Sequence, residues 1–344
     1  MSPTLTDVRT RLTDLAEQAG VSTATVSRVL NGKAGVSTQT RQAVLAALDV
    51  LGYERPEKLR TRSAGLVGLV VPELTNPVFP AFAQVIESML SERGYTPLLC
   101  TQSPGGTTED QYVEMLLDHG VDGIVFVSGL HADTAASLDR YHRLRSRGLP
   151  LVLVNGFAEG VDAPSVSTDD VAAITLAFRH LVSLGHRSIG LAIGPDRFVP
   201  AKRKVASFRE NLMRNFGAGV EGHIVTTLFT VEGGQAAAAE LIAAGHTAII
   251  AGSDLMALGA IRAARARGLR VPEDISVVGY DDSPLIAFTD PPLTTVRQPV
   301  QAMGHAAVSA LVAEIGGVKS PRTELLFHPE LIVRESTGAA PGQH

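Results

Sequence analysis

Polar and charged side chains stand directly after apolar runs at several points in the chain. Asn155 follows the run PLVLV, Ser253 follows TAIIAG, and Asp281 follows ISVVGY. In open α/β sheets, ligands bind outside the carboxyl ends of the strands, so these side chains are candidate ligand contacts. Carboxylates accept hydrogen bonds from hydroxyl groups, and amides both donate and accept, which is the chemistry that a polyol needs. A strand-end acid such as Asp281 has little structural role of its own, which favours ligand binding.

Cations and aromatic residues extend this set. Residues 202–204, with the sequence KRK, follow the run SIGLAIGPDRFVPA, and their ammonium and guanidinium groups are hydrogen-bond donors for hydroxyls. Phe79 follows the first apolar run and Phe229 follows HIVTTL. An aromatic face covers the apolar side of a sugar ring, and charge-assisted hydrogen bonds to the hydroxyls contribute about 1.5–3 kcal/mol each. The set therefore indicates a binding site for a polyol.

Several of these candidates also have a structural alternative. Phe79 and Phe229 are equally compatible with packing in a hydrophobic core. Asp254 is predicted to cap the helix that follows it. Arg203 is compatible with a solvated helix face, and Asp282 with holding the turn before a Ser-Pro pair.

Catalytic signatures are missing from the sequence. It contains no GxxxxGK[ST] phosphate loop, no HExxH and no GxSxG, and its ten histidines lack the spacing of metal ligands. The adjacent acids Asp169 and Asp170 follow Thr168, a predicted cap, and suit a helix N-terminus through the helix dipole. No set of nucleophile, base and orienting group is present, so we predict neither an enzyme nor a bound metal or cofactor.

From residue 65 onward, short apolar runs alternate with amphipathic stretches. The apolar runs are LVGLVV, TPLLC, GIVFV, PLVLV, SIGLAI, TAIIA and ISVVGY. Helices are predicted between them, over residues 79–93, 109–119, 169–184, 201–216, 233–244 and 255–267. Near-continuous apolar strands are buried on both faces, and their alternation with helices predicts parallel, doubly wound α/β sheets. There are enough strands for two such sheets.

Composition sets the broad class of the protein. The chain has 344 residues, of which 45% are hydrophobic, and this predicts a globular protein of two or three units. Its single cysteine, Cys100, excludes an internal disulfide and any CxxC motif. No apolar run is long enough to cross a bilayer, and the first residues lack the apolar region of a signal peptide. We therefore predict a cytoplasmic protein.

Charge is unevenly distributed along the chain. Residues 1–62 carry nine Lys and Arg against six Asp and Glu, a net charge of +3 within an overall charge of −5. The rest of the chain is therefore acidic. A basic head on an acidic body is the distribution expected when only the head has an anionic partner.

Residues 12–53 have the pattern of three short helices. Apolar residues recur at helical spacing from Leu12 to Ala19, and Gly20 supplies a left-handed stop. Ser22 is a good N-cap for a second helix over residues 23–30, which has small polar residues on its outer face. A helix, a tight turn with glycine and a second helix of this kind form a helix-turn-helix. The alternative is a three-helix cap without a DNA role.

Several motifs carry a family resemblance. The string DLAEQAGVSTATVSRVLNG, followed by VSTQTRQAV and LGY, resembles the DNA-binding headpiece of the lactose-repressor (LacI/GalR) family of bacterial regulators. The later motifs GLVGLVVPELTNPVFPAFAQVIE, HLVSLGHRSIGLAIGP, GSDLMALGAIRAARARGLRVPEDISVVGYDD and PPLTTVRQP are similar to that family's, in the same order. The resemblance extends over residues 12–335.

The resemblance implies three parts. They are a helix-turn-helix headpiece (10–54), a hinge or linker (55–64), and a two-lobed core like that of periplasmic binding proteins (65–338). Lobe 1 is expected over about 65–163 and 297–327, and lobe 2 over about 164–296 and 328–338, with the first crossing near residues 160–165. Residues 1–11 are predicted to be a loose leader, and the final STGAAPGQH a disordered tail.

The headpiece is expected to read double-stranded operator DNA. The implied DNA contacts are Thr13, Ser22, Thr23, Ala24, Thr25, Ser27, Arg28, Asn31, Thr40 and Leu59. Arg28 is the guanine reader of this set, since its guanidinium matches the O6 and N7 acceptors, and the hydroxyl residues fix register on phosphates. Leu59 matches the leucine that wedges into the minor groove from a hinge helix. The linker is shorter than is usual in the family, so the hinge helix stays an open question.

The resemblance also assigns the effector contacts. They are Phe79, Asn155, Lys204, Phe229, Ser253 and Asp281. Lys204 stands where the family usually has an arginine, and Ser253 where it commonly has an asparagine. Because lysine lacks the planar fork of arginine, a standard hexose is not assumed. A sugar or sugar derivative is expected, and a purine, a sugar phosphate or a partner protein remain as alternatives.

Together these features predict a transcriptional regulator, most simply a repressor, that binds a palindromic operator as a homodimer and responds to a small effector. The C-terminus has no leucine heptad, which favours a dimer over a tetramer. Whether the effector releases or strengthens DNA binding stays open. Two other classes remain. A solute-binding receptor would leave the basic head unexplained, and an enzyme would need a catalytic set that the sequence lacks.

Overall fold

The computed structural model describes residues 5–31, 36–53, 65–102, 105–217, 220 and 222–342. The chain divides into two compact units, Met1–Ser63 and Ala64–His344. The predicted linker over 55–64, including Leu59, lies outside the described residues. We describe each unit by itself.

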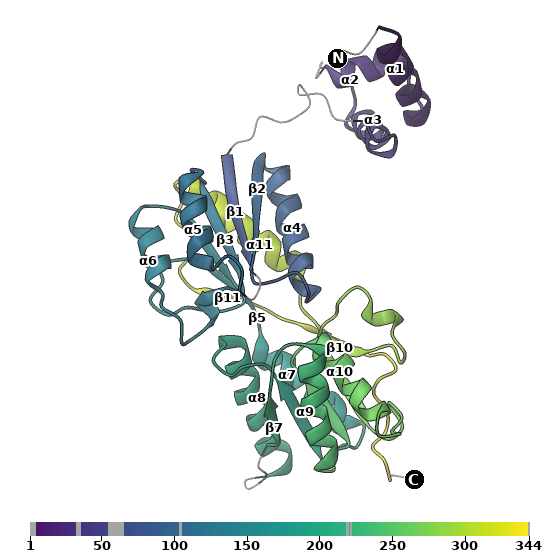
Figure 1. Ribbon diagram of the computed structural model, residues 1–344, viewed down its shortest axis with the longest axis vertical. Helices are drawn as coiled ribbons and strands as arrows, with labels where there is room; N and C mark the ends of the chain where they lie inside the picture. The colour runs from purple at the N-terminus through teal and green to yellow at the C-terminus, as the bar shows by residue number, and fades with distance from the viewer. Residues whose placement is uncertain are drawn as a thin grey trace. The chain divides into compact units, whose positions relative to one another are not determined.

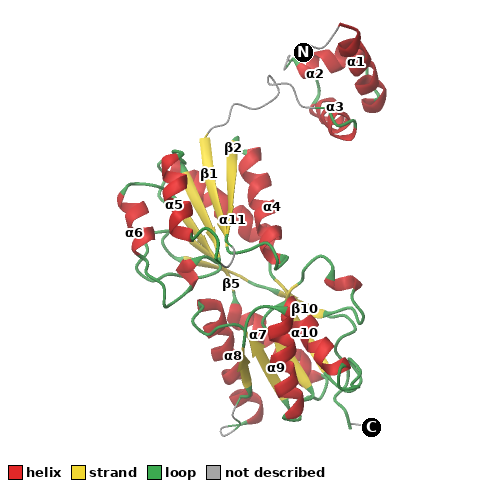
Figure 2. Ribbon diagram, viewed as in Figure 1, coloured by secondary structure: helices red, strands yellow, loops and turns green. Residues whose placement is uncertain are grey.

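The first unit is a three-helix headpiece. Its helices are α1 (Leu5–Ala19), α2 (Thr23–Leu30) and α3 (Thr38–Val50), which Figure 2 shows in red. They pack around a small core that contains Leu15, Val26 and Val44. Gly20 has φ +64°, as the predicted left-handed stop requires.

The start of α1 corrects the sequence reasoning. The predicted loose leader over residues 1–11 is wrong for residues 5–11, because α1 begins at Leu5. This stretch contains neither glycine nor proline, so nothing in it interrupts a helix that is nucleated further along the chain.

The second unit contains two six-stranded sheets. The first sheet has the order β11-β5-β4-β3-β1-β2 and the second β12-β10-β9-β8-β6-β7. Figure 1 shows the two parts of the unit that are built on these sheets. We call the parts built on them lobe 1 and lobe 2. The strands of lobe 1 are β1 (Gly65–Val71), β2 (Tyr95–Thr101), β3 (Gly123–Val127), β4 (Leu151–Val154), β5 (Ser165–Thr168) and β11 (Glu324–Phe327). Those of lobe 2 are β6 (Ile189–Ile193), β7 (Ile224–Thr226), β8 (Ala248–Ala251), β9 (Ser276–Asp281), β10 (Thr294–Arg297) and β12 (Glu330–Ile332).

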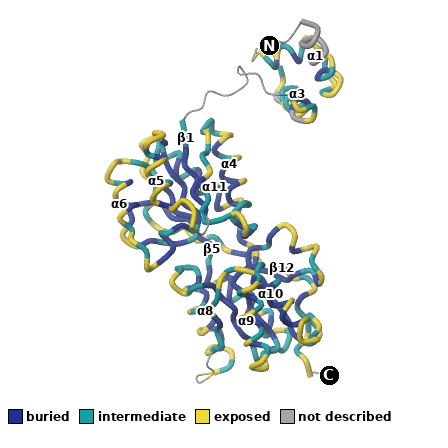
Figure 3. The backbone as a smooth tube through the Cα atoms, viewed as in Figure 1, coloured by how far each residue is buried: buried dark blue, intermediate teal, exposed yellow. Residues whose placement is uncertain are grey.

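Helices cover both faces of each sheet. Lobe 1 has α4 (Val78–Glu92) and α11 (Val300–Ile315) in one buried cluster, and α5 (Glu109–Asp118) and α6 (Asp139–Ser146) in another. In lobe 2, α7 (Asp170–Ser183) and α8 (Val199–Phe216) share one cluster, and α9 (Val231–Ala243) and α10 (Asp254–Arg265) the other. The central strands are buried throughout (Figure 3). All neighbouring strands are parallel except β10 and β12, so the predicted doubly wound α/β fold is confirmed.

The chain crosses between the lobes three times, and the first predicted crossing is wrong. We expected lobe 2 to begin at about residue 164, but β5 pairs with β4 and β11 in the sheet of lobe 1. The first crossing therefore lies between Thr168 and Asp170. The sequence of β5, SVST, has one apolar residue and gives no apolar run, because its buried side chains are mostly hydroxyls. The other crossings join β10 to α11 and β11 to β12.

The C-terminal segment packs on lobe 2. The hydroxyl of Ser336 is buried, donates to the carbonyl oxygen of Val277 at 2.6 Å and accepts from the amide of Thr294 at 2.8 Å. The amide of Ala340 donates to the carbonyl oxygen of Leu184 at 2.9 Å. The predicted disordered tail is thus wrong for these residues, because hydrogen bonds to β9, β10 and the end of α7 hold a segment with few apolar side chains.

Among the described helices, none combines the length and the apolar character needed to span a lipid bilayer.

Candidate functional site

A cavity of about 530 Å³ lies between the two lobes, at the carboxyl ends of their strands. All six predicted effector contacts line it: Phe79, Asn155, Lys204, Phe229, Ser253 and Asp281. Phe79 and Asn155 come from lobe 1 and the other four from lobe 2. This volume falls within the range of about 300–1,000 Å³ that is usual for small-molecule sites. The structure therefore brings the predicted residues together from distant parts of the sequence.

Three residues at strand ends beside the cavity have left-handed backbones. Ser128 has φ 47°, Asn155 has φ 55° and Asp281 has φ 121°, and all three line the cavity. They follow or end β3, β4 and β9. Residues other than glycine adopt such angles at a cost of about 1–3 kcal/mol each, and strain of this kind gathers at binding sites. The backbone turns sharply there, where the strands meet the cavity.

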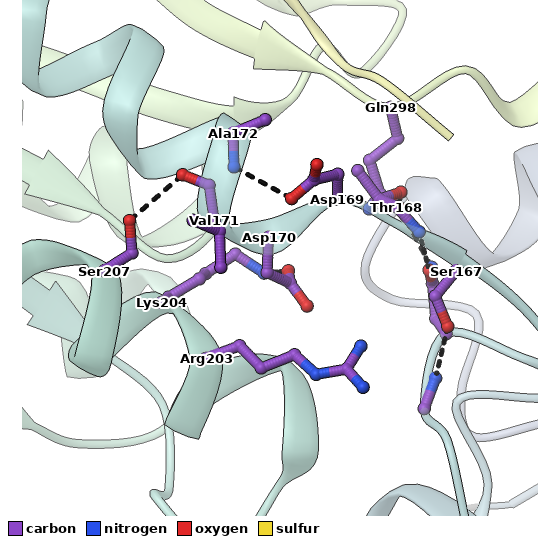
Figure 4. A network of polar contacts seen from close by, with 12 residues as sticks. Ser167, Thr168, Asp169, Asp170, Val171, Ala172, Arg203, Lys204, Ser207 and Gln298 are labelled. Carbon is purple, nitrogen blue, oxygen red and sulfur yellow. Dashed lines mark hydrogen bonds and ion pairs between the residues drawn. The ribbon is translucent and has the colours of Figure 1, made fainter. Parts of the chain in front are cut away.

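Lys204 is held by a buried ion pair. Its Nζ contacts Oδ1 of Asp170, and both side chains are about 5% exposed. The same Nζ lies 4.0 Å from the centroid of the Tyr280 ring. Burial raises the pKa of Asp170, and the Lys204 charge opposes that rise. Figure 4 shows Lys204 and Asp170 within a network of polar side chains around the first crossing. A charged donor and a charged acceptor therefore lie side by side in the wall of the cavity.

Asp281 is buried among hydrogen-bond donors. Its Oδ1 accepts from Nε2 of Gln298 at 2.7 Å, and the side chain of Asn76 also hydrogen-bonds to it. Burial raises the pKa of Asp281 well above its usual range, and the nearby charge of Asp254 raises it further. Burial likewise raises the pKa of Asp254 to about 6. Burial therefore disfavours the charged form of both Asp281 and Asp254.

The cap of α10 differs from the prediction. Ser253, not Asp254, is the N-cap, because its Oγ accepts from the amide of Met256 at 3.2 Å. Asp254 accepts from Oγ1 of Thr295 at 2.6 Å and from the amide of Ser283 at 2.7 Å. The carboxylate thus holds the turn after β9 instead of capping the helix.

The cap of α7 is also one residue further along than predicted. Thr168 was expected to cap this helix, but the Oδ1 of Asp169 accepts from the amide of Ala172 at 2.9 Å. Asp169 is therefore the N-cap. The hydroxyl of Thr168 instead donates to Oε1 of Gln298 at the crossing.

Two charged candidates have partners outside the cavity. Arg203 makes two hydrogen bonds of 2.7 Å each to Glu324, so it is not a solvated helix charge. Asp282 accepts from Arg297 at 2.7 Å and from Arg334 at 2.6 Å. It therefore joins β10 to the segment after β12, a larger role than the predicted one of holding a turn.

Phe79 and Phe229 both pack against a hydrophobic core and line the cavity, so each combines the two predicted alternatives. Phe79 is partly buried against the core of lobe 1 and Phe229 against the two clusters of lobe 2, while both line the cavity. Their rings therefore form apolar walls of the cavity, one from each lobe.

Sequence reasoning missed several residues that line the cavity. They are Asn76, Asp170, Arg197, Tyr280 and Gln298. Asp170 was noted only as a helix acid, because the burial of Lys204 that makes their pairing necessary is not visible in the sequence. Gln298 had no signal, since the strand before it, TTVR, is short and mixed. Neither motif nor periodicity indicates that its side chain turns into the cavity.

The predicted DNA contacts lie on and around α2. Exposed members are Thr13, Ser22, Thr23, Ala24, Arg28 and Asn31, whereas Thr25, Ser27 and Thr40 are half-buried. Ser22 caps α2 by accepting from the amide of Thr25 at 3.1 Å. Nδ2 of Asn31 donates to the carbonyl oxygen of Ser27 at 2.8 Å and closes the other end. Leu59 lies outside the described residues.

Within the part of the chain that the structure describes, no group of three or more His, Cys, Asp or Glu side chains is placed to hold a metal ion.

Comparison with known proteins gives two domain matches. Residues 11–56 match the description "Bacterial regulatory proteins, lacI family", and residues 178–337 match "Periplasmic binding protein-like domain". The first match covers most of the headpiece, and the second covers most of lobe 2 together with α11 and β11 of lobe 1.

Relatives match along nearly the whole chain. The transcriptional regulator reg1 of Streptomyces lividans is 64% identical over 97% of this chain and 98% of its own length. The regulator MalR of Streptomyces coelicolor is 63% identical over the same shares. A solved complex of the regulator CelR with cellobiose has a TM-score of 0.70 and 33% identity, and the match covers 97% of this chain and all of that one. These relatives are regulators and not enzymes, and this chain belongs to the LacI family of DNA-binding bacterial transcriptional regulators.

Proposed function

We propose that the protein is a repressor that binds a palindromic operator as a homodimer, and that a saccharide in the cavity between the lobes changes its affinity for the operator. The observation that carries the proposal is the convergence of six predicted contacts from both lobes on one cavity. A regulator of this kind acts in the cytoplasm, where operator DNA and metabolized sugars meet.

The headpiece supports operator recognition. Arg28 is exposed near the end of α2, and Thr23 and Ala24 are exposed at its start. Their small side chains let the helix backbone approach the floor of the major groove, where Arg28 can pair with a guanine. A lac repressor dimer solved on its operator has a TM-score of 0.70 and 28% identity, over 95% of this chain and 99% of that one. This supports two headpieces on one palindrome.

The cavity supports a saccharide. It offers carboxylates at Asp170 and Asp281, a cation at Lys204 and amides at Asn155 and Gln298, so hydroxyls meet acceptors and donors. Aromatic rings from both lobes supply apolar walls. Related structures were solved with cellobiose, lactose and ribose. The cavity therefore offers the hydrogen-bonding groups and the apolar walls that a mono- or disaccharide needs.

Operator binding is tested with Arg28→Ala. A duplex selected from a randomised library should bind the wild type with an affinity that falls steeply with salt, and the variant should lose about 1–3 kcal/mol of sequence discrimination. Arg179→Ala removes the same charge from an exposed position in lobe 2 and serves as the matched control. A wild-type protein that selects no duplex, or an Arg28→Ala variant with wild-type discrimination, would remove the DNA half of the proposal.

Saccharide binding is tested by calorimetry with a panel that includes cellobiose, lactose and ribose. Asp281→Ala should weaken the tightest binder by about 1.5–3 kcal/mol, the usual value for a hydrogen bond to a charged group. Asp118→Ala, an exposed acid on α5, should leave it unchanged. If no sugar of the panel binds, or if Asp281→Ala binds as the wild type does, the saccharide half fails. Sedimentation equilibrium tests the dimer.

A further inference from the structure

The side chain of Gln298 lies between the two lobes. Gln298 is the residue after β10, at the second crossing between the lobes, and its side chain is 6% exposed. It lines the cavity and also a second hollow between α4, α11 and the turn at residues 281–284. The amide therefore lies on the boundary between the effector cavity and the connections that join the lobes.

The two ends of this amide contact different lobes. Nε2 donates to Oδ1 of Asp281 in lobe 2 at 2.7 Å. Oε1 accepts from Nδ2 of Asn155 at 2.9 Å and from Oγ1 of Thr168 at 2.8 Å, both in lobe 1. Thr168 ends β5 at the first crossing, and Figure 4 shows it beside Gln298. One side chain thus joins two crossings and two cavity residues.

The polarity of the amide fixes this arrangement. Its oxygen accepts and its nitrogen donates, so Gln298 turns its donor toward Asp281 when Asn155 and Thr168 hold its oxygen. Asn155 and Asp281 both have left-handed backbones, so each side chain enters the cavity from a sharp turn. A change in the relative position of the lobes that separates these partners leaves the buried Asp281 without this donor.

We propose that Gln298 is the positioning residue that couples effector binding to the arrangement of the lobes, by presenting Asp281 to the effector only when its amide spans both lobes. This inference rests on the proposed saccharide-controlled repressor. A ligand shifts a conformational equilibrium only by its differential affinity for the two states. The hydrogen bonds of Gln298 to both lobes supply that difference in affinity. They orient Asp281 toward a hydroxyl of the effector in one state of the lobes, and they are broken in the other.

The first test replaces the amide with an isosteric side chain. The readout is the coupling ratio, which we define as the larger divided by the smaller of the two operator affinities measured with and without saccharide. Wild-type ratios are expected at about 5–150-fold. Gln298→Met should reduce the ratio to less than about threefold and weaken the tightest-binding panel sugar by roughly tenfold. Thr168→Val, which removes one of two donors to Oε1, should reduce it less. Gln301→Met, at an exposed position on α11, is the matched control and should keep the wild-type ratio.

The second test uses pH and separates coupling from loss of structure. In Gln298→Glu the introduced carboxylate keeps two acceptor oxygens for Asn155 and Thr168 but faces Asp281 without a proton. When two carboxyls share a site, the pKa of one of them is strongly raised, because both cannot be charged at once. Acidification should therefore protonate one carboxyl and restore a donor between them. The coupling ratio of this variant should therefore rise as the pH is lowered from about 8 to about 5.5, whereas that of Gln298→Met should follow the wild type's pH trend at its reduced level.

The outcomes distinguish this inference from the function on which it rests. If the wild type binds a selected duplex and a sugar, and Gln298→Met keeps the wild-type coupling ratio, the inference is wrong and the repressor proposal stands. The same holds if the ratio of Gln298→Glu does not respond to pH. If the wild type itself binds no duplex or no sugar, the proposed function fails and the inference fails with it.

Discussion

Arg203 and Glu324 are joined by two hydrogen bonds of 2.7 Å each, and they belong to different lobes. Arg203 lies on α8 of lobe 2 and Glu324 begins β11 at the edge of the lobe 1 sheet. A paired fork of this kind has a narrow range of allowed geometry, so it fits one relative position of the lobes. Neither residue lines the cavity, but both charges also act on the buried carboxyl of Asp170, which does.

We therefore expect Arg203→Met and Glu324→Gln each to weaken saccharide binding, by roughly three- to tenfold, because the arrangement that encloses the cavity becomes less populated. The double variant should be no weaker than either single variant, so the coupling energy of this partly exposed pair should equal the loss in one single variant, about 0.7–1.4 kcal/mol. Calorimetric titration of all four proteins measures this. The control is Arg265→Met, which breaks an ion pair within lobe 2 and should not change affinity. Additive losses in the double variant would show that the pair does not act as a unit.

A second prediction concerns the buried ion pair of Lys204 and Asp170. Lys204→Met leaves a carboxylate buried without its cation, which costs about 3–5 kcal/mol of the free energy of unfolding. Burial already raises the pKa of Asp170, and removal of the lysine charge raises it further. The double variant Lys204→Met/Asp170→Asn should recover part of the loss. Urea denaturation at neutral pH gives the three stabilities. A Lys204→Met variant as stable as the wild type would mean that the pair contributes nothing.

A third prediction follows from Asp254. Burial raises its pKa from the ordinary 3.8 to about 6 in the folded protein. Because the folded state then binds the proton more tightly than the unfolded state, this carboxyl contributes stability that is complete below about pH 3.8 and is lost as the pH rises through about 6. In Asp254→Asn this loss is absent. The stability of the wild type relative to the variant should therefore decrease between about pH 4 and pH 6, by up to about 3 kcal/mol. Denaturation curves across that range check the sign, and a constant or increasing difference would contradict it.

A fourth prediction uses the glycine that precedes the loop between β6 and α8. A Cβ on Gly194 would lie 2.0 Å from Cε2 of the Phe229 ring. Gly194→Ala should therefore displace this ring, which forms one apolar wall of the cavity, and weaken saccharide binding by roughly tenfold. Gly316→Ala, where a Cβ meets only ordinary contacts of 3.4 Å, should bind as the wild type does. The affinities come from the same titration. Equal affinities for the two variants would show that the ring does not contact the sugar.

The sequence predicted most of the fold because the strands that form the sheet centres are apolar runs. Segments such as ISVVGY and PLVLV are recognisable alone, since burial on both faces leaves no polar positions. β5 was missed because the side chains of SVST are mostly hydroxyls, so its burial leaves no apolar signal in the sequence. The lobe boundary was wrong for that reason.

The site was predictable where a side chain directly follows a recognisable strand. Asn155 and Asp281 belong to this class. Gln298 and Asp170 do not, because their roles depend on partners that are distant in sequence. Thr168 is 130 residues from Gln298, and Lys204 is 34 from Asp170. Nothing in the local sequence encodes such a pairing, since it arises only when both lobes have formed around the crossings.

The most direct test of the whole account is a fluorescence anisotropy titration of a selected operator duplex, with and without the tightest-binding sugar of the panel. We predict that the sugar changes the operator affinity of the wild type by at least about fivefold, and that Asp281→Ala binds the duplex normally but no longer responds to the sugar. Operator affinity that is the same with and without a bound sugar would contradict the central claim, since the cavity and the headpiece would then be uncoupled.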